Sequence, residues 1–330
     1  MNKRLLNILL ISLILGISSC KRIPLYDENN TMSLDLVLRL NINVDIDVSI
    51  TEGLDIKIPA TITPPTYNKV LFYSPSDNSL HYSTFVGTTG GAIFTPPGAY
   101  KMLVYSFGTE YIQIRGENDI NTIEAYTSDV TATKMKILRS FTRAGETDPP
   151  GPIIYAPDHL LVAREDVVIP EWTGESQTIT IDALSKTIVE SYSFEVSTVV
   201  GTEYIQSCEA FVTNQSRSSF FGRGEISTEP ATICFEVGVN KTKNCLYTVF
   251  NTFGKLPGES VSYLHILIKD TGGTEHRVTV DITDQFEKAD HHIIIDEPVV
   301  IPTPLPPGGE GGIAPTVDPW SEETTDVGIG

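Results

Sequence analysis

An apolar residue stands at every second position from Met32 to Ile50, and this alternation constrains the fold more than any other feature of the sequence. The apolar positions are Met32, Leu34, Leu36, Leu38, Leu40, Ile42, Val44, Ile46, Val48 and Ile50, and the residues between them are polar except Val37. A period of two places successive side chains on opposite faces of a strand. The pattern therefore predicts a β-strand with one buried face and one wet face.

This strand is too long to continue unbroken. At about 3.3 Å per residue it would extend about 60 Å, whereas strands in globular proteins have about 5–6 residues. We therefore expect a bend or a break near Asn41-Ile42-Asn43. Asp45, Asp47 and Ser49 resemble the start of a calcium-binding loop, but the twelfth position, which requires Glu, holds Ile56. A solvated strand face is the better interpretation.

Short apolar runs separated by turn residues continue through the rest of the chain. Val70 to Tyr73 is followed by Pro75-Ser76-Asp77-Asn78, and Tyr100 to Phe107 has the composition of a core strand. Residues 261–282, with Gly272-Gly273 near the middle, are typical of a β-hairpin. No long window has the 3.6-residue period of a helix. The sequence therefore predicts an all-β fold of sandwiches or barrels.

The N-terminus has the organisation of an export signal. Lys3 and Arg4 precede the apolar run Leu5 to Ile17, which is shorter than the roughly 20 residues of a membrane-spanning helix. Ser18-Ser19 then precede Cys20. We predict cleavage between Ser19 and Cys20, a diacylglycerol on the Cys20 thiol and a further acyl chain such as palmitate on the new amine. The alternative is an ordinary secretory signal with an incidental cysteine.

The charge of the chain limits the partners that it can attract. It has 23 Lys and Arg against 42 Asp and Glu, a net charge of -19, and loss of Lys3 and Arg4 with the signal would leave 21 against 42, a net charge of -21. An acidic body argues against nucleic acid and against electrostatic docking to anionic lipid. Attachment to a membrane would therefore depend on the lipid.

Three cysteines remain after Cys20, namely Cys208, Cys234 and Cys245. The number is odd, so at least one has no partner within the chain. They form no C-x-x-C and have no histidine at zinc-ligand spacing. Either all three are buried thiols, or two of them form one disulfide within a domain.

A repeated hexapeptide predicts two related β-domains. Gly108 to Gln113 and Gly201 to Gln206 are both Gly-Thr-Glu-Tyr-Ile-Gln, and a Tyr-Ser-Phe precedes each, directly in the first copy and with six residues between in the second. We expect a signal peptide at 1–19, a lipidated tether at 20–30, an N-terminal β-sandwich at 31–172, a C-terminal β-sandwich at 173–297 and a disordered tail at 298–330. The tail is rich in Pro and Gly, and Trp320 is its only large aromatic residue.

The sequence has no recognisable catalytic or metal-binding motif. G-x-S-x-G, H-E-x-x-H, the P-loop and the dinucleotide fingerprint are all missing from it. His291 and His292 are adjacent and would point to opposite faces of a strand, which is a poor start for metal chelation. We therefore predict no catalytic residue, no metal site and no cofactor. A hydrolase that uses a pair of carboxylates is the last of the alternatives.

Several short motifs resemble one family. They are Cys20-Lys21-Arg22 followed by Leu25-Tyr26, Pro97-Gly98-Ala99-Tyr100 leading into Leu103-Val104-Tyr105, Gly108-Thr109-Glu110, Asp158-His159-Leu160, and the stretch from Tyr192 to Ala210. In these the chain resembles the fimbrillin-like lipoproteins of Bacteroides-type bacteria, especially the anchor or minor-subunit group with a domain of unknown function. The similarity spans most of residues 20–296.

This resemblance implies tandem transthyretin-like, Greek-key β-sandwiches and a role in surface pili that assemble by β-strand complementation. It implies a lipid-anchored, surface-exposed place in the cell outer membrane, with other fimbrial subunits as partners. The strand that starts at Met32 would suit such a system as a first-sheet strand retained in place. The tail lacks the pattern of a donor strand, which favours an anchor or accessory role. The alternative function is a surface glycan-binding lipoprotein of a nutrient-uptake system, which predicts an exposed aromatic platform.

Overall fold

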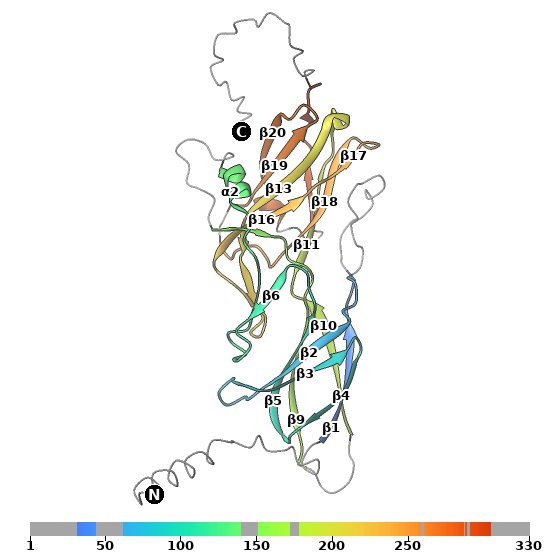
Figure 1. Ribbon diagram of the computed structural model, residues 1–330, viewed down its shortest axis with the longest axis vertical. Helices are drawn as coiled ribbons and strands as arrows, with labels where there is room; N and C mark the ends of the chain where they lie inside the picture. The colour runs from blue at the N-terminus through green and yellow to red at the C-terminus, as the bar shows by residue number, and fades with distance from the viewer. Residues whose placement is uncertain are drawn as a thin grey trace, which may run out of the picture.

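The fold is described from a computed structural model, in which residues 32–43, 62–139, 151–171, 178–258, 261–286, 288 and 291–304 are placed. Across these residues the chain forms β-strands, with one α-helix and short 3-10 turns. The predicted all-β class is confirmed. Figure 1 shows an elongated molecule in which a lower and an upper group of strands are stacked along the long axis.

The lower group, which we call the N-terminal lobe, is a seven-stranded closed sheet in the order β1-β10-β9-β5-β2-β3-β4. Its interior is filled by side chains from all parts of the sheet, among them Leu36, Phe72 and Met102. Its strands are β1 (Met32–Leu40), β2 (Tyr67–Tyr73), β3 (Leu80–Gly87), β4 (Gly90–Thr95), β5 (Gly98–Phe107), β9 (Leu161–Ile169) and β10 (Thr178–Thr187).

Two joints that close this sheet are short. β3 and β4 are paired only at Gly87↔Gly90, and β10 meets β9 only at Lys186↔Val162 and Thr187↔Leu161. All other ladders in the lobe are several residues long. The N-terminal lobe is therefore two facing sheets, β4-β1-β10 and β3-β2-β5-β9, that touch at their corners.

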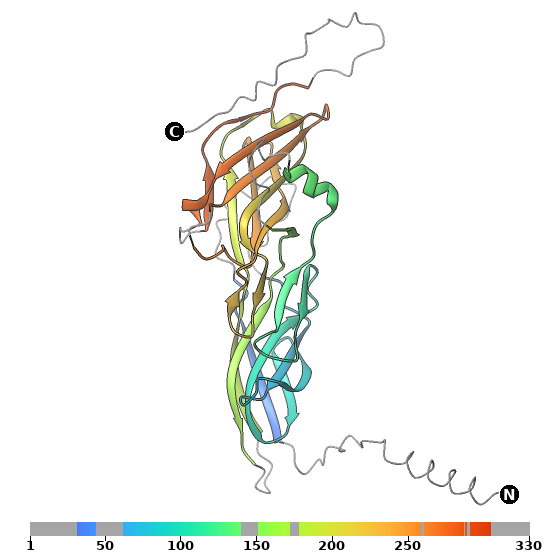
Figure 2. The same cartoon turned by 90° about the vertical axis from the view of Figure 1, so that its left-hand side faces the viewer.

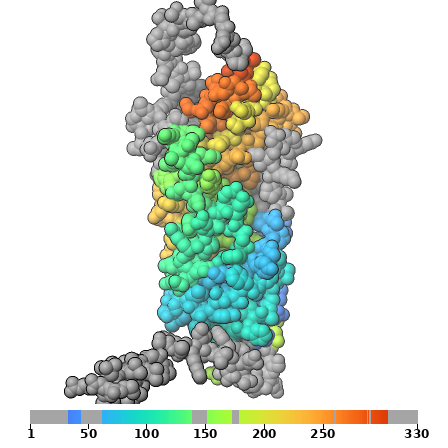
Figure 3. Space-filling model, in the orientation of Figure 1, coloured from blue at the N-terminus to red at the C-terminus, as the bar shows by residue number. Residues whose placement is uncertain are grey.

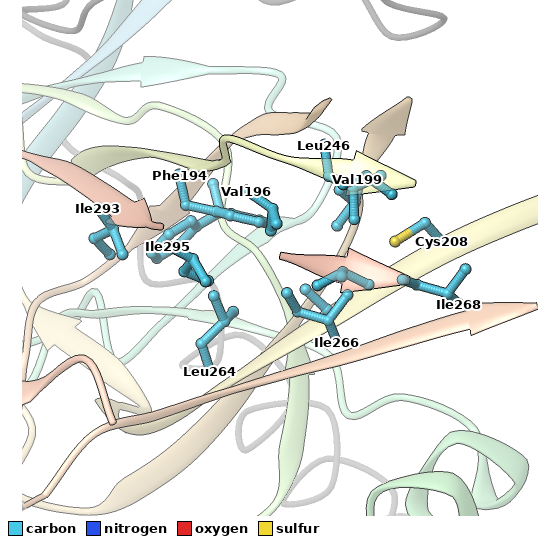
Figure 4. Packing of buried hydrophobic residues seen from close by; sticks show 14 of the residues in the cluster. Phe194, Val196, Val199, Cys208, Leu246, Leu264, Ile266, Ile268, Ile293 and Ile295 are labelled. Carbon is cyan, nitrogen blue, oxygen red and sulfur yellow. The ribbon is translucent and has the colours of Figure 1, made fainter. Parts of the chain in front are cut away.

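The upper group, which we call the C-terminal lobe, packs two larger sheets face to face. Phe194, Leu246, Leu264 and Ile266 lie in the core between them, and Figure 4 shows these side chains pointing toward one another. One sheet is β20 (Glu275–Asp281), β19 (Tyr263–Asp270), β13 (Ile205–Ser216), β16 (Pro230–Glu236) and β8 (Ile153–Tyr155); the other is β17 (Gly238–Asn240), β18 (Cys245–Thr252), β11 (Glu190–Val196) and β21 (His292–Ile295). β12 (Val199–Val200) and β22 (Val299–Val300) form a separate two-stranded sheet whose Val199 and Val299 join the same core. Two 3-10 turns, η2 (Thr202–Tyr204) and η3 (Thr283–Gln285), complete the described elements of the lobe.

A small third sheet joins the lobes. It consists of β6 (Ile112–Arg115), β7 (Glu124–Thr127), β14 (Ser218–Phe220) and β15 (Glu225–Ile226), so strands from both halves of the chain contribute to it. Phe221, directly after β14, packs edge-on against Tyr105 of β5 with ring centroids 5.5 Å apart. Figure 2 shows this sheet beside the N-terminal lobe. The short helix α2 (Ala132–Arg139) contributes Met135 and Ile137 to a separate cluster with Phe211 of β13.

The strands near the predicted domain junction pair differently from our expectation. The stretch from Gln177 to Ile181, which we placed in the second domain, enters β10, and β10 pairs with β1 and β9 in the N-terminal lobe. Conversely β8, which we placed before the junction, pairs with β16 in the C-terminal lobe. The order of the strands along the chain did not predict their partners, because strand pairing depends on contacts between residues far apart in the sequence. The domain limits themselves, 31–172 and 173–297, stay predictions.

The start of the predicted tail is also different. Val299 and Ile301 are only 8% and 2% exposed and belong to the core of the C-terminal lobe, and β22 pairs in parallel with β12. The two residues Val299 and Val300 are sufficient to form a short strand, although Pro298 and Pro302 lie close on either side. The rest of the tail, with Trp320, lies outside the described residues.

The two copies of the hexapeptide share one local feature. Gly108 and Gly201 both have positive φ, 95° and 85°, which a glycine adopts without strain. Ile112 and Ile205 are then buried at the start of a strand in each copy. The strands differ in place, since β6 lies in the joining sheet and β13 in the C-terminal lobe. Common descent of the two lobes therefore stays a prediction.

Candidate functional site: the seat of strand β1

Strand β1 lies between two strands from distant parts of the chain. It pairs in parallel with β10 from Ser33↔Thr178 to Leu40↔Ser185, and antiparallel with β4 from Met32↔Thr95 to Val37↔Gly90. Figure 1 shows it at the lower end of the N-terminal lobe, running upward beside β10. The strand ends at Leu40, which confirms the break that we predicted near residues 41–43. The second half of the alternating pattern, with Asp45 and Asp47, lies outside the described residues.

Three leucines fix which face of β1 is inside. Leu34, Leu36 and Leu38 are 0%, 1% and 4% exposed, as the alternation predicted. They pack with the interior residues of β2, β4 and β5. Burial of a leucine side chain stabilises a fold by about 1.5–3 kcal/mol. The three together therefore hold β1 in its seat with several kcal/mol.

The neighbours of β1 depend on it for most of their backbone hydrogen bonds. β4 has only a single-residue pairing with β3 on its other side, and β10 has only two residue pairs with β9. β1 is also bonded to the β3–β4 turn, because the Leu38 N–H donates a hydrogen bond to the Thr89 carbonyl over 2.9 Å. Without β1, both flanking strands would present unpaired edges to solvent, which a sheet protein avoids. We use "the seat of β1" for this place between β4 and β10, a groove whose two sides are the backbone edges of these strands and which β1 fills.

A glycine allows β1 to approach β4. Gly90 has φ 105°, and a Cβ built on it would lie 1.8 Å from the carbonyl oxygen of Leu36. No side chain could occupy that space without moving the backbone of β1. This close contact depends on the register between β1 and β4, which the sequence alone does not give.

The outward face of β1 contributes little binding energy. Arg39 Nε lies 2.7 Å from Asp182 Oδ1 of β10, but both side chains are more than half exposed, at 63% and 56%. Such an exposed ion pair contributes about 0–1 kcal/mol. Val37, the one apolar residue on this face, is 39% exposed. Occupancy of the seat is therefore decided by the leucines and the two ladders.

A second surface feature of the N-terminal lobe was not predicted from the sequence. Tyr67, Phe85 and Phe107 are 57%, 52% and 51% exposed. Phe85 of β3 and Phe107 of β5 meet edge to face, with ring centroids 5.2 Å apart, and the ammonium of Lys69 lies 5.9 Å from the centre of the Phe85 ring. We call these four residues the aromatic patch. The alternation of β2, β3 and β5 could have placed these side chains on one face, but not shown that the face is uncovered.

The predicted lipidation site cannot be placed. Ser19 and Cys20 both lie outside the described residues, so the cleavage and lipidation that we predict there stay predictions. In the part of the chain that is described, no helix has the length and apolar composition that crossing a membrane requires.

The three remaining cysteines are free thiols. Cys208, Cys234 and Cys245 are 5%, 3% and 2% exposed, and none is in a disulfide. Burial raises the pKa of the Cys234 thiol to about 11, although the Lys134 ammonium, 3.6 Å from the sulfur, acts in the opposite direction. Burial also raises the pKa of Cys208 and of Cys245. Of the two alternatives left open by the sequence, the structure therefore has buried thiols.

The histidines have separate structural partners. His291 stacks on Tyr192 with centroids 4.4 Å apart, and His292 Nδ1 lies 2.7 Å from Ser193 Oγ. Among the described residues no group of histidine, cysteine and carboxylate side chains is placed to hold a metal ion. The others contact Tyr100 (His81), Thr187 and Ser191 (His159), Thr279 (His265) and Asp270 (His276).

Comparison with known proteins gives relatives that span nearly the whole chain. A Bacteroides ovatus protein provisionally named fimbrium anchoring subunit Fim4B is 25% identical over an alignment of 353 residues, which covers 96% of this chain and 95% of that protein. The crystal structure of a protein from Bacteroides ovatus, provisionally described as an adhesin, aligns with a TM-score of 0.54 and 22% identity over 86% of this chain and 98% of that one. This likeness shows a shared fold.

The family is given by a sequence model rather than by these single relatives. The model of the family described as "Domain of unknown function (DUF5119)" matches residues 39–236, which is more than half of the chain. The match includes β4 and β10, which flank β1, but only Arg39 and Leu40 of β1 itself. The predicted resemblance to a group with a domain of unknown function is thereby confirmed. This chain belongs to the DUF5119 family.

Proposed function

We propose that this protein is a membrane-anchored fimbrial anchor or minor subunit, attached through lipid on Cys20 and non-enzymatic. The observation that carries the proposal is the occupied seat of β1: the groove between β4 and β10 is already filled by the chain's own strand. A subunit whose groove is filled has no place there for a strand from a neighbour. It therefore suits the end of an assembly rather than its repeating middle. The 25% identity to a protein provisionally named as a fimbrium anchoring subunit supports this.

Contact with the next subunit then uses another edge. Among the described strands of the C-terminal lobe, β20, with seven residues, is the longest at a sheet edge. Val278 and Val280 pack toward the core, and the alternate residues Arg277, Thr279 and Asp281 are exposed. An edge of this kind can accept an extended strand through main-chain hydrogen bonds. The two facing sheets in each lobe support the further description of the lobes as tandem transthyretin-like sandwiches.

The anchoring role is tested in a strain that lacks the gene and is complemented with variants. We expect the deletion and the Cys20→Ser variant to release fimbriae into the medium, while the wild-type protein retains them on the cells. Mass spectrometry of the purified wild-type protein should give a mature chain that begins at Cys20 and carries lipid. Unchanged attachment of fimbriae in the deletion strain would refute the proposal.

A disulfide lock tests whether β1 stays in its seat. Asp35 and Ala92 are direct partners across the antiparallel ladder, where Cα atoms are about 4.5–5.5 Å apart, within the range that a disulfide spans. If β1 is retained, the Asp35→Cys, Ala92→Cys variant should anchor fimbriae as well as wild type. Loss of anchoring that returns on reduction would mean that β1 must leave. Cross-linking between anchor and neighbouring subunit would then identify the edge in use.

Glycan binding is a second candidate because of the aromatic patch. Three aromatic side chains that are each more than half exposed are the kind of platform that this function predicts. Binding of the mature protein to a glycan array, lost on Tyr67→Ala but not on Tyr263→Ala, would support it. Tyr263 is a suitable control because it is 41% exposed and lies in the other lobe. An array without binding would count against this candidate.

A further inference from the structure

Two large apolar side chains point into solvent at positions where an outward-facing strand residue is usually polar. Phe94 of β4 is 61% exposed and Val168 of β9 is 74% exposed. The residues on either side of each one are buried, with exposures between 0% and 6%. Alternation along the strand therefore fixes both side chains on the outer surface. Neither position is explained by the core or by the seat of β1.

Both residues lie at the same end of the N-terminal lobe. Phe94 is one residue before the end of β4, where Thr95 pairs with Met32 at the start of β1. Val168 is one residue before the end of β9, where Ile169 pairs with Gly98 at the start of β5. In Figure 1 these strand ends lie at the lower end of the described strands, and Figure 3 shows the N-terminal lobe, mainly blue to green, in the lower part of the coloured surface. We call it the β1 end.

The chain around Phe94 has no formal charge. Residues 78–100, which include β3, β4 and the turn into β5, contain no Asp, Glu, Lys or Arg, although a fifth of the whole chain is charged. On the Val168 side two acids are exposed: Glu171 follows the strand, and Asp166 lies two residues before Val168 on the same face of β9. The β19–β20 turn of the C-terminal lobe also contrasts with the Phe94 side, since Glu275 is exposed at that turn. The uncharged part of the β1 end is therefore the side around Phe94, formed by β3, β4 and the turn into β5.

The turn beside Phe94 is held in shape. The Tyr100 hydroxyl donates a hydrogen bond to the Pro96 carbonyl over 3.2 Å, and Tyr100 itself is 7% exposed. Two prolines, Pro96 and Pro97, restrict the backbone further. A surface that is already ordered loses little conformational entropy when it binds.

The position of Cys20 indicates what meets this surface. Cys20 precedes Met32, the first residue of β1, by a short tether that can extend at most about 40 Å. The tether joins the body at the β1 end, so a lipid on Cys20 would bring this end to the bilayer. The acidic body argues against electrostatic attraction to anionic lipid, so apolar contact is the attraction that we expect. Aromatic and aliphatic side chains at an interface provide that contact.

We infer that the β1 end rests against the membrane, with Phe94 and Val168 in contact with lipid at the bilayer surface. The inference rests on the proposed lipid attachment at Cys20 and adds a defined orientation to it: the long axis stands away from the membrane. The β20 edge and the C-terminal lobe then face outward, where a neighbouring subunit can reach them.

Quenching by brominated lipid tests the contact. The full lipidated protein, with Trp172→Phe and Trp320→Phe to remove native emission, carries a single tryptophan at position 94, 168 or 107 and is reconstituted in phosphatidylcholine vesicles with or without brominated acyl chains. Phe107 is the matched control, because it is 51% exposed but lies at the other end of β5, about 30 Å away.

We expect Phe94→Trp and Val168→Trp each to lose roughly half of their emission, since an interfacial side chain lies about 5–10 Å into the headgroup and acyl boundary. Phe107→Trp should lose none, and added salt should change neither result. If mass spectrometry shows lipid on Cys20 but position 94 or 168 is not quenched, the contact is refuted while lipid anchoring stands. Equal quenching at all three positions refutes the upright orientation. A chain without lipid refutes both the anchoring and this inference.

Discussion

Replacement of Leu36 by alanine measures how strongly β1 is held. Leu36 is 1% exposed at the centre of the strand, and its partners across the two ladders are Gly91 of β4 and Ile181 of β10. Loss of about three carbon atoms removes about 2.4 kcal/mol at about 0.8 kcal/mol for each one. Gly91 has no side chain that could move into the cavity, so a cavity cost is added. We expect a loss of about 3–4 kcal/mol, within the range of about 2–5 kcal/mol for such substitutions.

Hydrogen exchange read by mass spectrometry is the appropriate assay, because the two lobes need not unfold together. Opening of β1, β4 and β10 should become easier by this free energy, while amides of β13 and β19 keep their protection. In urea, with an m-value of about 2 kcal/mol/M, the transition of the N-terminal lobe should move down by about 1.5–2 M.

The neighbouring position supplies the control. Val37 is 39% exposed on the outer face of the same strand, and Val37→Ala should cost at most about 0.5 kcal/mol. A loss below about 1 kcal/mol for Leu36→Ala, or an equal loss of protection in both lobes, would refute the reasoning that burial of the leucines holds β1 in its seat.

Three further predictions follow from individual residues. Gly90→Ala should expose the amides of β4 and β1 to exchange, because the new Cβ would lie 1.8 Å from the Leu36 carbonyl, whereas Gly87→Ala, whose Cβ meets only the Gly90 carbonyl at 3.5 Å, should be tolerated; equal behaviour of the two variants would contradict this. Thiol titration of the native mature protein at about pH 8 should detect almost no reaction, because all three described cysteines are buried with raised pKa values; after unfolding it should count those three and no fourth, since a reactive Cys20 would contradict its acylation. Hydrogen bonds from His276 and from the N–H groups of Thr274 and Gly272 lower the pKa of Asp270, so ionised Asp270 stabilises the fold at a pH above its pKa in the unfolded chain, and this stabilisation is lost as the pH falls through its lower pKa in the folded protein. The stability difference between wild type and Asp270→Asn should therefore shrink below about pH 4, and a constant difference down to about pH 2 would be evidence against this ion pair.

Local patterns in the sequence were sufficient for several elements. The alternation at Met32 to Leu40, the run at Tyr100 to Phe107 and the hairpin after residue 261 all form strands at or close to the predicted places. Each depends on the period of its own side chains and on nearby turn residues, which act within a few positions of the chain. The buried state of the cysteines was left open, since a disulfide depends on distances that spacing does not give.

The amino-acid pattern was enough to predict that Leu34, Leu36 and Leu38 face inward, that the body is all-β, and that the short motifs resemble one family. Long-range packing was needed to establish that β1 runs parallel to β10, that β8 pairs in the other lobe, that Val299 and Ile301 belong to its core, and that Phe94 and Val168 are exposed. Backbone N–H and C=O groups are nearly the same in every residue. The alternation of apolar and polar side chains in a strand therefore predicts which face is buried but not which strand it pairs with. Arg39 and Asp182 meet across 143 residues of chain, and such a contact exists only once both strands have been brought together by the rest of the fold.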